Sequence, residues 1–212
     1  MAKHTIKNLP LFPLKAVLFP GSLLPLHIFE ERYKTLINEC IESGSEFGIN
    51  FVEGEKTDPI GCTASVKQVL KRYDDGRMDI VVEGNLRYTL KQLVENEAPY
   101  FVGEVSFFDD NQEEVNKSLR LQVVEMYEQF TDVVFNATAP SASTRESDER
   151  ISFFLVQKSG LELKERQNFL SVRSENERLA VLKRHFEAML PLIASRDKYE
   201  RLVVNDGYLA PF

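Results

Sequence analysis

An apolar stretch interrupted by prolines constrains the fold of this chain more than any other feature. The stretch LFPLKAVLFPGSLLPLHIFEERY covers residues 11–33 and contains Pro13, Pro20 and Pro25. A signal peptide needs an unbroken apolar segment of about 7 to 15 residues, and a membrane helix needs about 20. Each proline removes a helix donor and clashes with the preceding turn. We therefore predict that this stretch is built into a globular fold and inserts into no membrane.

The charge balance argues against a nucleic-acid partner. The chain has 212 residues and a formal net charge of −7, which opposes a phosphate backbone. Its one basic cluster, formed by Lys67, Lys71 and Arg72, is followed at once by Asp74 and Asp75. We interpret this cluster as a solvated strand face, with RNA contact as the alternative.

Cysteine and histidine spacing predicts neither a metal site nor an exported protein. Cys40 and Cys62 are the two cysteines, and two isolated thiols are typical of a reducing compartment, so we expect a cytoplasmic protein. His4, His27 and His185 are scattered, and none lies three or four residues from another, as a helical metal site requires. We expect no metal and no cofactor.

The first half of the chain reads as strands with one early helix. We expect strands at residues 16–19 and 23–28 around a Pro-Gly turn, then a helix from Phe29 to Ile41 that ends at Gly44. Short strands separated by the turn signals DPIG, DDG and EGN follow as far as Phe108. This pattern predicts a small, mostly antiparallel barrel or sandwich.

The second half reads as helices. An apolar stripe at helical spacing predicts a long helix from near Gln112 to Val134, and residues 137–148 read as a loop or linker. Shorter helices are expected at residues 148–158 and 164–170.

A last helix is expected to open on a capping box at Ser174 and Glu177 and to run to Pro191. We therefore divide the chain into a barrel subdomain at residues 1–109, a helical bundle at 110–200 and a tail at 201–212. The tail could pack as a hairpin or be disordered.

Three separated stretches carry a resemblance to a known family. LPLFPLKAVLFPGSLLPLHIFEERY, VEGNLRYTL and LELKERQNFLSVRSENERL occur in this order. They resemble the N-terminal substrate-recognition domain of Lon-type ATP-dependent proteases, which opens with a leucine-proline-rich strand, a Phe-Pro-Gly turn and a helix. Those features match residues 9–14, 19–21 and 29–41, and the family's VEG…R motif matches Val82-Glu83-Gly84 with Arg87. The Arg-Gln and Arg-Leu pairs of the helical end match residues 166–167 and 178–179.

The resemblance covers about residues 7–193 and implies both fold and function. It implies an α+β architecture, with a PUA-like pseudo-β-barrel followed by a C-terminal helical bundle. It also implies recognition of unfolded or tagged polypeptides, or of a protein partner. The ATPase and peptidase modules of the full proteases have no counterpart in this sequence, which therefore resembles a free-standing member of the family.

Motifs for catalysis are missing from the sequence. GINFVEGEKT, residues 48–57, fails as a phosphate loop because Glu55 separates the glycine from the lysine. No serine lies in a G-x-S-x-G elbow, and the acid pairs Asp74-Asp75 and Asp109-Asp110 sit beside turn signals. We predict a non-enzymatic protein.

Polypeptide recognition needs exposed apolar surface and open strand edges. The prolines of the opening stretch would blunt self-pairing of an edge strand while leaving its side chains free. Gly84 and Arg87 are interpreted as structural. Against the alternative that each belongs to the core, the candidate contact residues are Phe19, Pro20, Leu23, Leu24, Phe107, Phe108 and Phe135.

Three alternatives remain open at this point. PUA-like barrels elsewhere contact RNA, which would require a contiguous basic surface. An enzyme whose site is specific to the fold would show no motif. The apolar, strand-rich N-terminus is also compatible with a homodimer.

Overall fold

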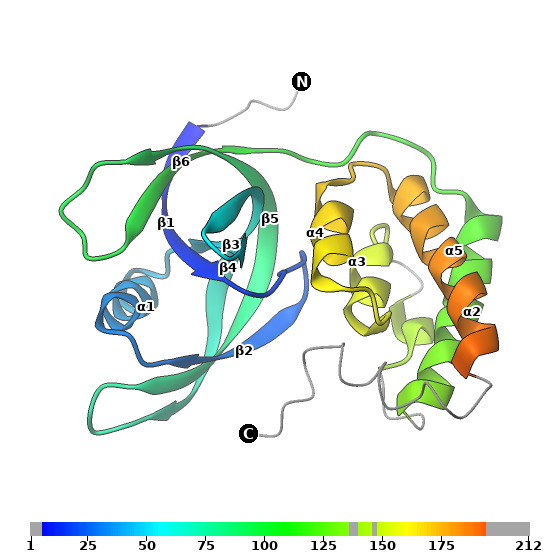
Figure 1. The fold of residues 1–212 in the computed structure, drawn as a ribbon, viewed down its shortest axis with the longest axis horizontal. Helices are drawn as coiled ribbons and strands as arrows, with labels where there is room; N and C mark the ends of the chain where they lie inside the picture. The colour runs from blue at the N-terminus through cyan, green and yellow to red at the C-terminus, as the bar shows by residue number, and fades with distance from the viewer. Residues whose placement is uncertain (1–5, 136–139, 146–147, 194–212) are drawn as a thin grey trace. The chain divides into compact units, whose positions relative to one another are not determined.

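The chain forms two compact units, Met1–Asp109 and Asp110–Phe212, which are described separately (Figure 1). The structure is a computed structural model that describes residues 6–135, 140–145 and 148–193. The C-terminal tail expected at residues 201–212 lies outside these residues. Within the described part of the chain, every helix is too short or too polar to cross a lipid bilayer.

Unit 1 is a six-stranded sheet that closes on itself. The strand order is β2-β5-β4-β3-β1-β6, and an additional pairing between β5 and β6 closes the ring. The long β5 strand makes this possible, because its first half pairs with β2 and its second half pairs with β6. The elements are β1 (Ile6–Leu14), β2 (Leu23–Ile28), α1 (Glu31–Ser43), β3 (Phe47–Glu53), β4 (Lys56–Arg72), β5 (Met78–Val94) and β6 (Phe101–Phe107).

A buried tyrosine fills the barrel. Tyr88 is 0% exposed, and its hydroxyl donates a hydrogen bond of 2.5 Å to Oδ1 of Asn50. Gly48 and Gly61 flank the ring, and a Cβ on either would stand within 2.4 Å of Tyr88 atoms. Both positions therefore have to be glycine for the tyrosine to fit, and Leu9, Leu11 and Val105 complete the cluster around it.

The helix α1 is confirmed, whereas the strand expected at residues 16–19 is wrong. α1 begins at Glu31 and ends at Gly44, whose φ of 66° is readily adopted by glycine. Residues 16–19 form an irregular segment that ends in a turn at Pro20 and Gly21. There the backbone bonds to β5, with Gly21 N donating to Gly84 O at 2.8 Å and Gly84 N donating to Ser22 O at 2.9 Å.

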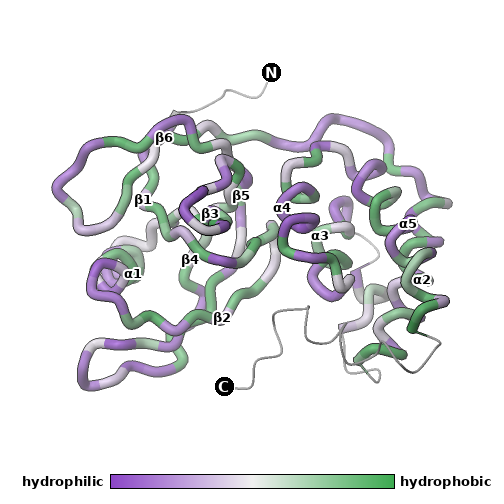
Figure 2. Tube along the Cα trace, viewed as in Figure 1, coloured by the Kyte–Doolittle hydropathy of each residue, from purple (hydrophilic) through white to green (hydrophobic). Residues whose placement is uncertain are grey.

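Unit 2 is helical, and its two long helices α2 and α5 lie side by side (Figure 1). Hydrophobic and hydrophilic residues alternate along both (Figure 2). Tyr127 and Phe130 of α2 meet Phe186 of α5, with ring centroids 6.3 and 5.3 Å apart. The helices are α2 (Lys117–Phe135), η1 (Ala142–Arg145), α3 (Ser152–Leu155), η2 (Val156–Lys158), α4 (Leu163–Ser171) and α5 (Glu175–Ile193).

Helix starts differ from the sequence prediction for local reasons. α2 begins about five residues later than predicted, because Oδ1 of Asn116 accepts a hydrogen bond from the Leu119 backbone N–H and so caps the helix. At α5, Ser174 Oγ accepts from Glu177 N at 3.1 Å, as expected for one half of a capping box. A box with both halves present forms instead at α4, between Glu162 and Glu165.

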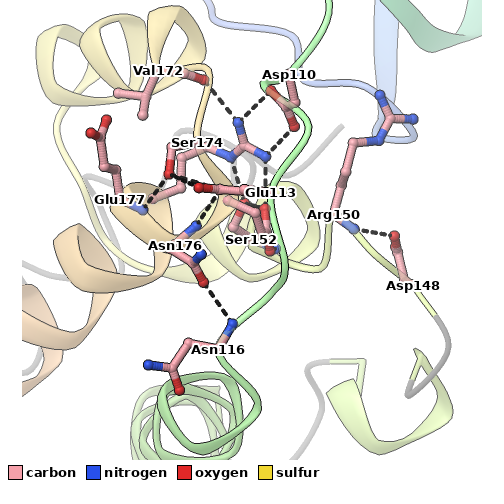
Figure 3. Close-up of polar contacts among 12 residues, drawn as sticks. Asp110, Glu113, Asn116, Asp148, Arg150, Ser152, Val172, Ser174, Asn176 and Glu177 are labelled. Atoms are coloured by element: carbon pink, nitrogen blue, oxygen red, sulfur yellow. Dashed lines mark hydrogen bonds and ion pairs between the residues drawn. The ribbon is translucent and has the colours of Figure 1, made fainter.

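A buried arginine ties together the helix ends of unit 2, and Figure 3 shows the polar contacts around its partners Asp110, Ser152 and Val172. The side chain of Arg178 is 0% exposed and forms two hydrogen bonds to Asp110, at 2.8 and 2.6 Å. It also bonds to Glu175 Oε2 at 2.7 Å, to Ser152 Oγ at 2.8 Å and to the Val172 carbonyl at 2.8 Å. The network therefore joins the segment before α2 to α3, to the end of α4 and to the start of α5.

The predicted architecture, a pseudo-barrel followed by a helical bundle, is confirmed.

Candidate functional site

Unit 1 contains a groove of about 600 Å³ whose lining comes from five parts of the fold. The end of β1, the outer strand β2, the hairpin between β3 and β4, the start of α1 and the start of β6 all contribute side chains. A groove of this size holds a few residues of an extended peptide. We take it as the candidate functional site.

Two strand edges border the groove without a neighbouring strand in the described sheet. β2 stands at the end of the strand order and pairs with β5. The β1 ladder with β6 stops at Leu11, whereas its ladder with β3 continues to Leu14, so residues 12–14 keep one edge open. An open edge of this kind is what an added peptide strand uses.

Each open edge contains a proline, Pro13 in β1 and Pro25 in β2. A proline is tolerated in a ladder where its nitrogen faces away from the paired strand. Both nitrogens therefore face the open edges, and the carbonyl of the same residue points the same way. The edges bordering the groove thus offer acceptors where a donor is missing.

Exposed aromatic carbon from two separate parts of the chain lines the groove. Phe29, which precedes α1, is 60% exposed, and Phe101, the first residue of β6, is 47% exposed. Leu26 of β2 and Leu14 of β1 are half-buried in the same lining. Large apolar side chains gathered in a groove mark a binding surface more strongly than scattered ones do.

The charged residues of the lining are Glu30, Arg32 and Glu55. Arg32 is held by Glu30 Oε2, at 3.0 Å from Nε and 2.7 Å from Nη2, and its guanidinium lies 4.7 Å from the Tyr33 ring centroid. Glu55 is exposed at the tip of the β3–β4 hairpin. The cation of the groove is therefore neutralised, and Glu55 leaves a negative charge there.

His27 lines the groove and is fixed by a carboxylate. Its Nδ1 lies 2.6 Å from Asp79 Oδ1, and the Tyr73 hydroxyl donates to Asp79 Oδ2 at 2.8 Å. The hydrogen bonds from His27 and then Tyr73 lower the pKa of Asp79. The hydrogen bond to Asp79 is also the main cause that raises the pKa of Tyr73. Asp79 thus orients the imidazole, and the phenol stays protonated at neutral pH.

The basic cluster of the sequence is engaged in local contacts. Lys67 Nζ lies 2.7 Å from Glu83 Oε2, Lys71 Nζ lies 4.4 Å from the Tyr73 ring centroid, and Arg72 donates to Asn38 Oδ1 at 3.0 Å. These contacts fit a solvated strand face. Among the described residues, no three His, Cys, Asp or Glu side chains are grouped as a metal ion would require.

Three of the residues predicted to contact a partner are buried. Phe19 is 0% exposed, Leu24 is 6% exposed, and Pro20 is buried with them. The turn folds back onto β5 so closely that a Cβ on Gly84 would stand 2.3 Å from the Phe19 carbonyl oxygen. The expectation that these three side chains are exposed is therefore wrong, whereas Leu23 is 52% exposed.

The other three predicted residues are half-buried and lie outside the groove lining. Phe107 packs against the barrel core. The Arg87 guanidinium lies 4.7 Å from the Phe108 ring centroid, and Lys158 Nζ lies 5.2 Å from that of Phe135. These faces are covered in part by neighbouring side chains, so we do not place them in the site.

Sequence reasoning missed Phe29 and Phe101. The sequence predicts a helix that starts at Phe29, but α1 begins two residues later, at Glu31, so the helical period does not apply to Phe29. Phe101 opens β6 directly after a stretch without regular structure. A signal was available for Phe29, because acids at the start of a helix mark its first turn and leave the preceding residue outside.

Comparisons with known proteins point to one family. The model of the ATP-dependent protease La (LON) substrate-binding domain matches residues 8–185. The chain is similar to the Lon protease of Flavobacterium johnsoniae, with 25% identity over 94% of this chain and 26% of that protein. It is also similar to the Lon protease of Brevibacillus choshinensis, with 25% identity over 83% of this chain and 24% of that protein. The chain thus spans about a quarter of the length of these relatives.

Solved structures share the fold. The Lon N-terminal domain protein from Xanthomonas campestris has a TM-score of 0.65 and 23% identity, covering 84% of this chain and 97% of that one. The N-terminal domain of the Mycobacterium avium complex Lon protease has a TM-score of 0.66 and 19% identity, covering 85% and 98%. Because the family model matches most of the chain, the chain belongs to the family of Lon protease substrate-binding domains.

Proposed function

We propose that this chain is a recognition module that binds apolar segments of unfolded polypeptides in the groove of unit 1. The observation that carries the proposal is the exposure of Phe29 and Phe101 in a groove bordered by two open strand edges. Membership in a substrate-binding family supports it. An unfolded polypeptide presents both apolar side chains and unpaired backbone groups, which such a groove can contact.

The contact is weak and reversible on this proposal. Complete covering of the exposed parts of Phe29 and Phe101 contributes about 5 kcal/mol, at roughly 25 cal/mol per Å² of apolar surface. Part of this is offset by the ordering of the guest chain. A module of this kind samples many clients and holds none of them for long.

The groove binds its guest without chemical change on this proposal. Its lining is mainly apolar, and its polar groups are strand-edge carbonyls, His27, the paired Glu30 and Arg32, Thr57 and Glu55, which fit contacts to a peptide. The His27 imidazole is held by Asp79 and contributes a polar contact at the rim.

Binding to a permanently unfolded protein tests the proposal. A reduced, carboxymethylated and fluorescently labelled protein serves as the client, and its native form serves as the comparison. We expect Phe29→Ser combined with Phe101→Ser to weaken binding about tenfold in fluorescence anisotropy, since 1.4 kcal/mol corresponds to a factor of ten.

The matched control is Leu121→Ser, which removes an apolar side chain that is 69% exposed on α2 of unit 2. It should leave the affinity unchanged. Equal binding by the wild type and the Phe29 and Phe101 double variant, or equal binding to native and unfolded client, would contradict the proposal.

A further inference from the structure

The two open edges of the groove each lack one backbone hydrogen-bond donor. The open edges carry proline at residues 13 and 25, and each has a carbonyl but no N–H. The Arg32 guanidinium directs Nε and Nη2 to Glu30, and the His27 Nδ1 atom lies against Asp79. At the two proline positions the open edges thus offer acceptors without donors.

The net charge of the lining is negative, and like the acceptors at the open edges it favours a positively charged donor. Glu30 and Arg32 neutralise each other at 2.7 Å, which leaves the exposed carboxylate of Glu55 at the hairpin tip. Lys56 follows Glu55 in the chain, but the lining includes Glu55 and not Lys56. The net charge of −7 adds a weak long-range attraction for cations.

Resting on the proposed function, we infer that the guest favoured by this groove is an extended apolar segment that carries a lysine or arginine. Both side chains are donors only, so they complement strand-edge carbonyls and the Glu55 carboxylate at once. Their aliphatic stems pack on aromatic carbon such as Phe29 while the charged end reaches the rim. An acidic residue at the same place brings a like charge against Glu55 and an acceptor against the proline carbonyls.

The test uses three labelled peptides that differ at one central position. Each has about eight residues, the length of a typical strand, and alternates valine and threonine around one phenylalanine. The central residue is lysine, glutamine or glutamate. Anisotropy titrations with the full chain give the three affinities at low salt, where exposed charge pairs have their largest effect.

We expect the lysine peptide to bind about fivefold more tightly than the glutamate peptide, with glutamine between them, as for one exposed charge pair. Glu55→Gln should reduce this ratio to below about twofold, and Glu55→Lys should invert it. The matched control is Glu125→Gln, which removes the same charge from an exposed position on α2 in unit 2. It should leave the ratio at its wild-type value.

The outcomes separate this inference from the proposed function. If the glutamine peptide binds and the Phe29 and Phe101 double variant weakens its binding about tenfold, the groove is a peptide site. Equal affinities of the lysine and glutamate peptides would then overturn the inference alone. A ratio that Glu55→Gln leaves unchanged would overturn it as well. If none of the peptides binds, both the inference and the proposed function fail.

Discussion

The two units handle exposed carbon and buried charge in opposite ways. Unit 1 leaves Phe29 60% exposed and Phe101 47% exposed beside open strand edges. Unit 2 buries Arg178 completely and satisfies it with two carboxylates, a hydroxyl and a carbonyl. The exposed rings of unit 1 keep apolar surface available for a guest. The Arg178 network of unit 2 uses its polar groups to fix the ends of its own helices.

The difference teaches which parts of the molecule are free to change. A buried ion pair contributes little net stability, but removing one of its members leaves an uncompensated charge. Removal of an exposed phenylalanine side chain leaves no buried group without its partner. Variants in unit 2 should therefore report on folding, and variants in the groove should report on binding.

Arg178→Met is the strongest test of this comparison. The change leaves Asp110 and Glu175 without the cation between them, so we expect a loss of about 3–5 kcal/mol in the free energy of unfolding of unit 2. Hydrogen exchange measured by mass spectrometry should show lost protection in residues 110–193. Arg184→Met, at an exposed position on the same helix, is the control and should change little. Unaltered exchange in Arg178→Met would contradict the assigned role of the network.

Gly84→Ala tests how closely the turn of unit 1 packs on β5. A Cβ there would stand 2.3 Å from the Phe19 carbonyl oxygen, which belongs to the backbone and cannot rotate away. We expect a loss of about 3 kcal/mol, measured by urea unfolding. Gly44→Ala is the comparison, because its φ is 66° but no atom lies within 4 Å of its Cβ position, so it should cost about 1 kcal/mol. An equal cost for the two changes would rule out the steric explanation.

Periodicity and capping residues made most of the fold predictable. The helix α1, the short helices and the late helix all follow from apolar spacing and end signals such as Gly44. The strand at residues 16–19 was wrong because β-branched and apolar residues also suit a buried irregular segment. There the tight turn at Gly21, bonded to Gly84, decides the conformation, and that contact is not visible in local sequence.

The groove was harder to predict than the fold. Phe19 and Phe29 have the same side chain and lie ten residues apart, yet one is 0% and the other 60% exposed. Their difference depends on where α1 begins and on the return of the turn to β5. Both are tertiary facts, and composition alone assigns large apolar residues to the core.

Two glutamates, Glu175 at the start of α5 and Glu113 bonded to that helix end through Ser174 and Asn176, should have pKa values shifted in opposite directions. Burial is the main cause that raises the pKa of Glu175 above its usual 4.5, and hydrogen bonds from Ser152 and Arg178 oppose it. For Glu113, partial desolvation is outweighed by hydrogen bonds from the Ser174 hydroxyl and the Asn176 backbone, which lower the pKa. Carboxyl ¹³C shifts followed by NMR should show a midpoint above 4.5 for Glu175 and below 4.5 for Glu113.

The two shifts have opposite effects on stability. The Glu113 contribution is present above its unfolded pKa and is lost as the pH falls through the lower folded value. The Glu175 contribution is present below its unfolded pKa and is lost as the pH rises through the higher folded value. Glu113→Gln should therefore reduce the loss of unit 2 stability at acid pH. Midpoints in the reverse order would contradict the burial of Glu175 and the hydrogen bonds that Glu113 accepts from Ser174 and Asn176, which Figure 3 draws.

Phe29→Ser should have the smallest effect on stability, although it is expected to weaken binding. Its ring is 60% exposed and lies outside α1, so we expect a change within about 0.5 kcal/mol in urea unfolding. Phe19→Ala, at a ring that is 0% exposed, should instead cost about 3–5 kcal/mol. A loss above about 1.5 kcal/mol for Phe29→Ser would mean that the ring supports the barrel. The groove would then be part of the folded core, and the contrast between an open unit 1 and a closed unit 2 would fail.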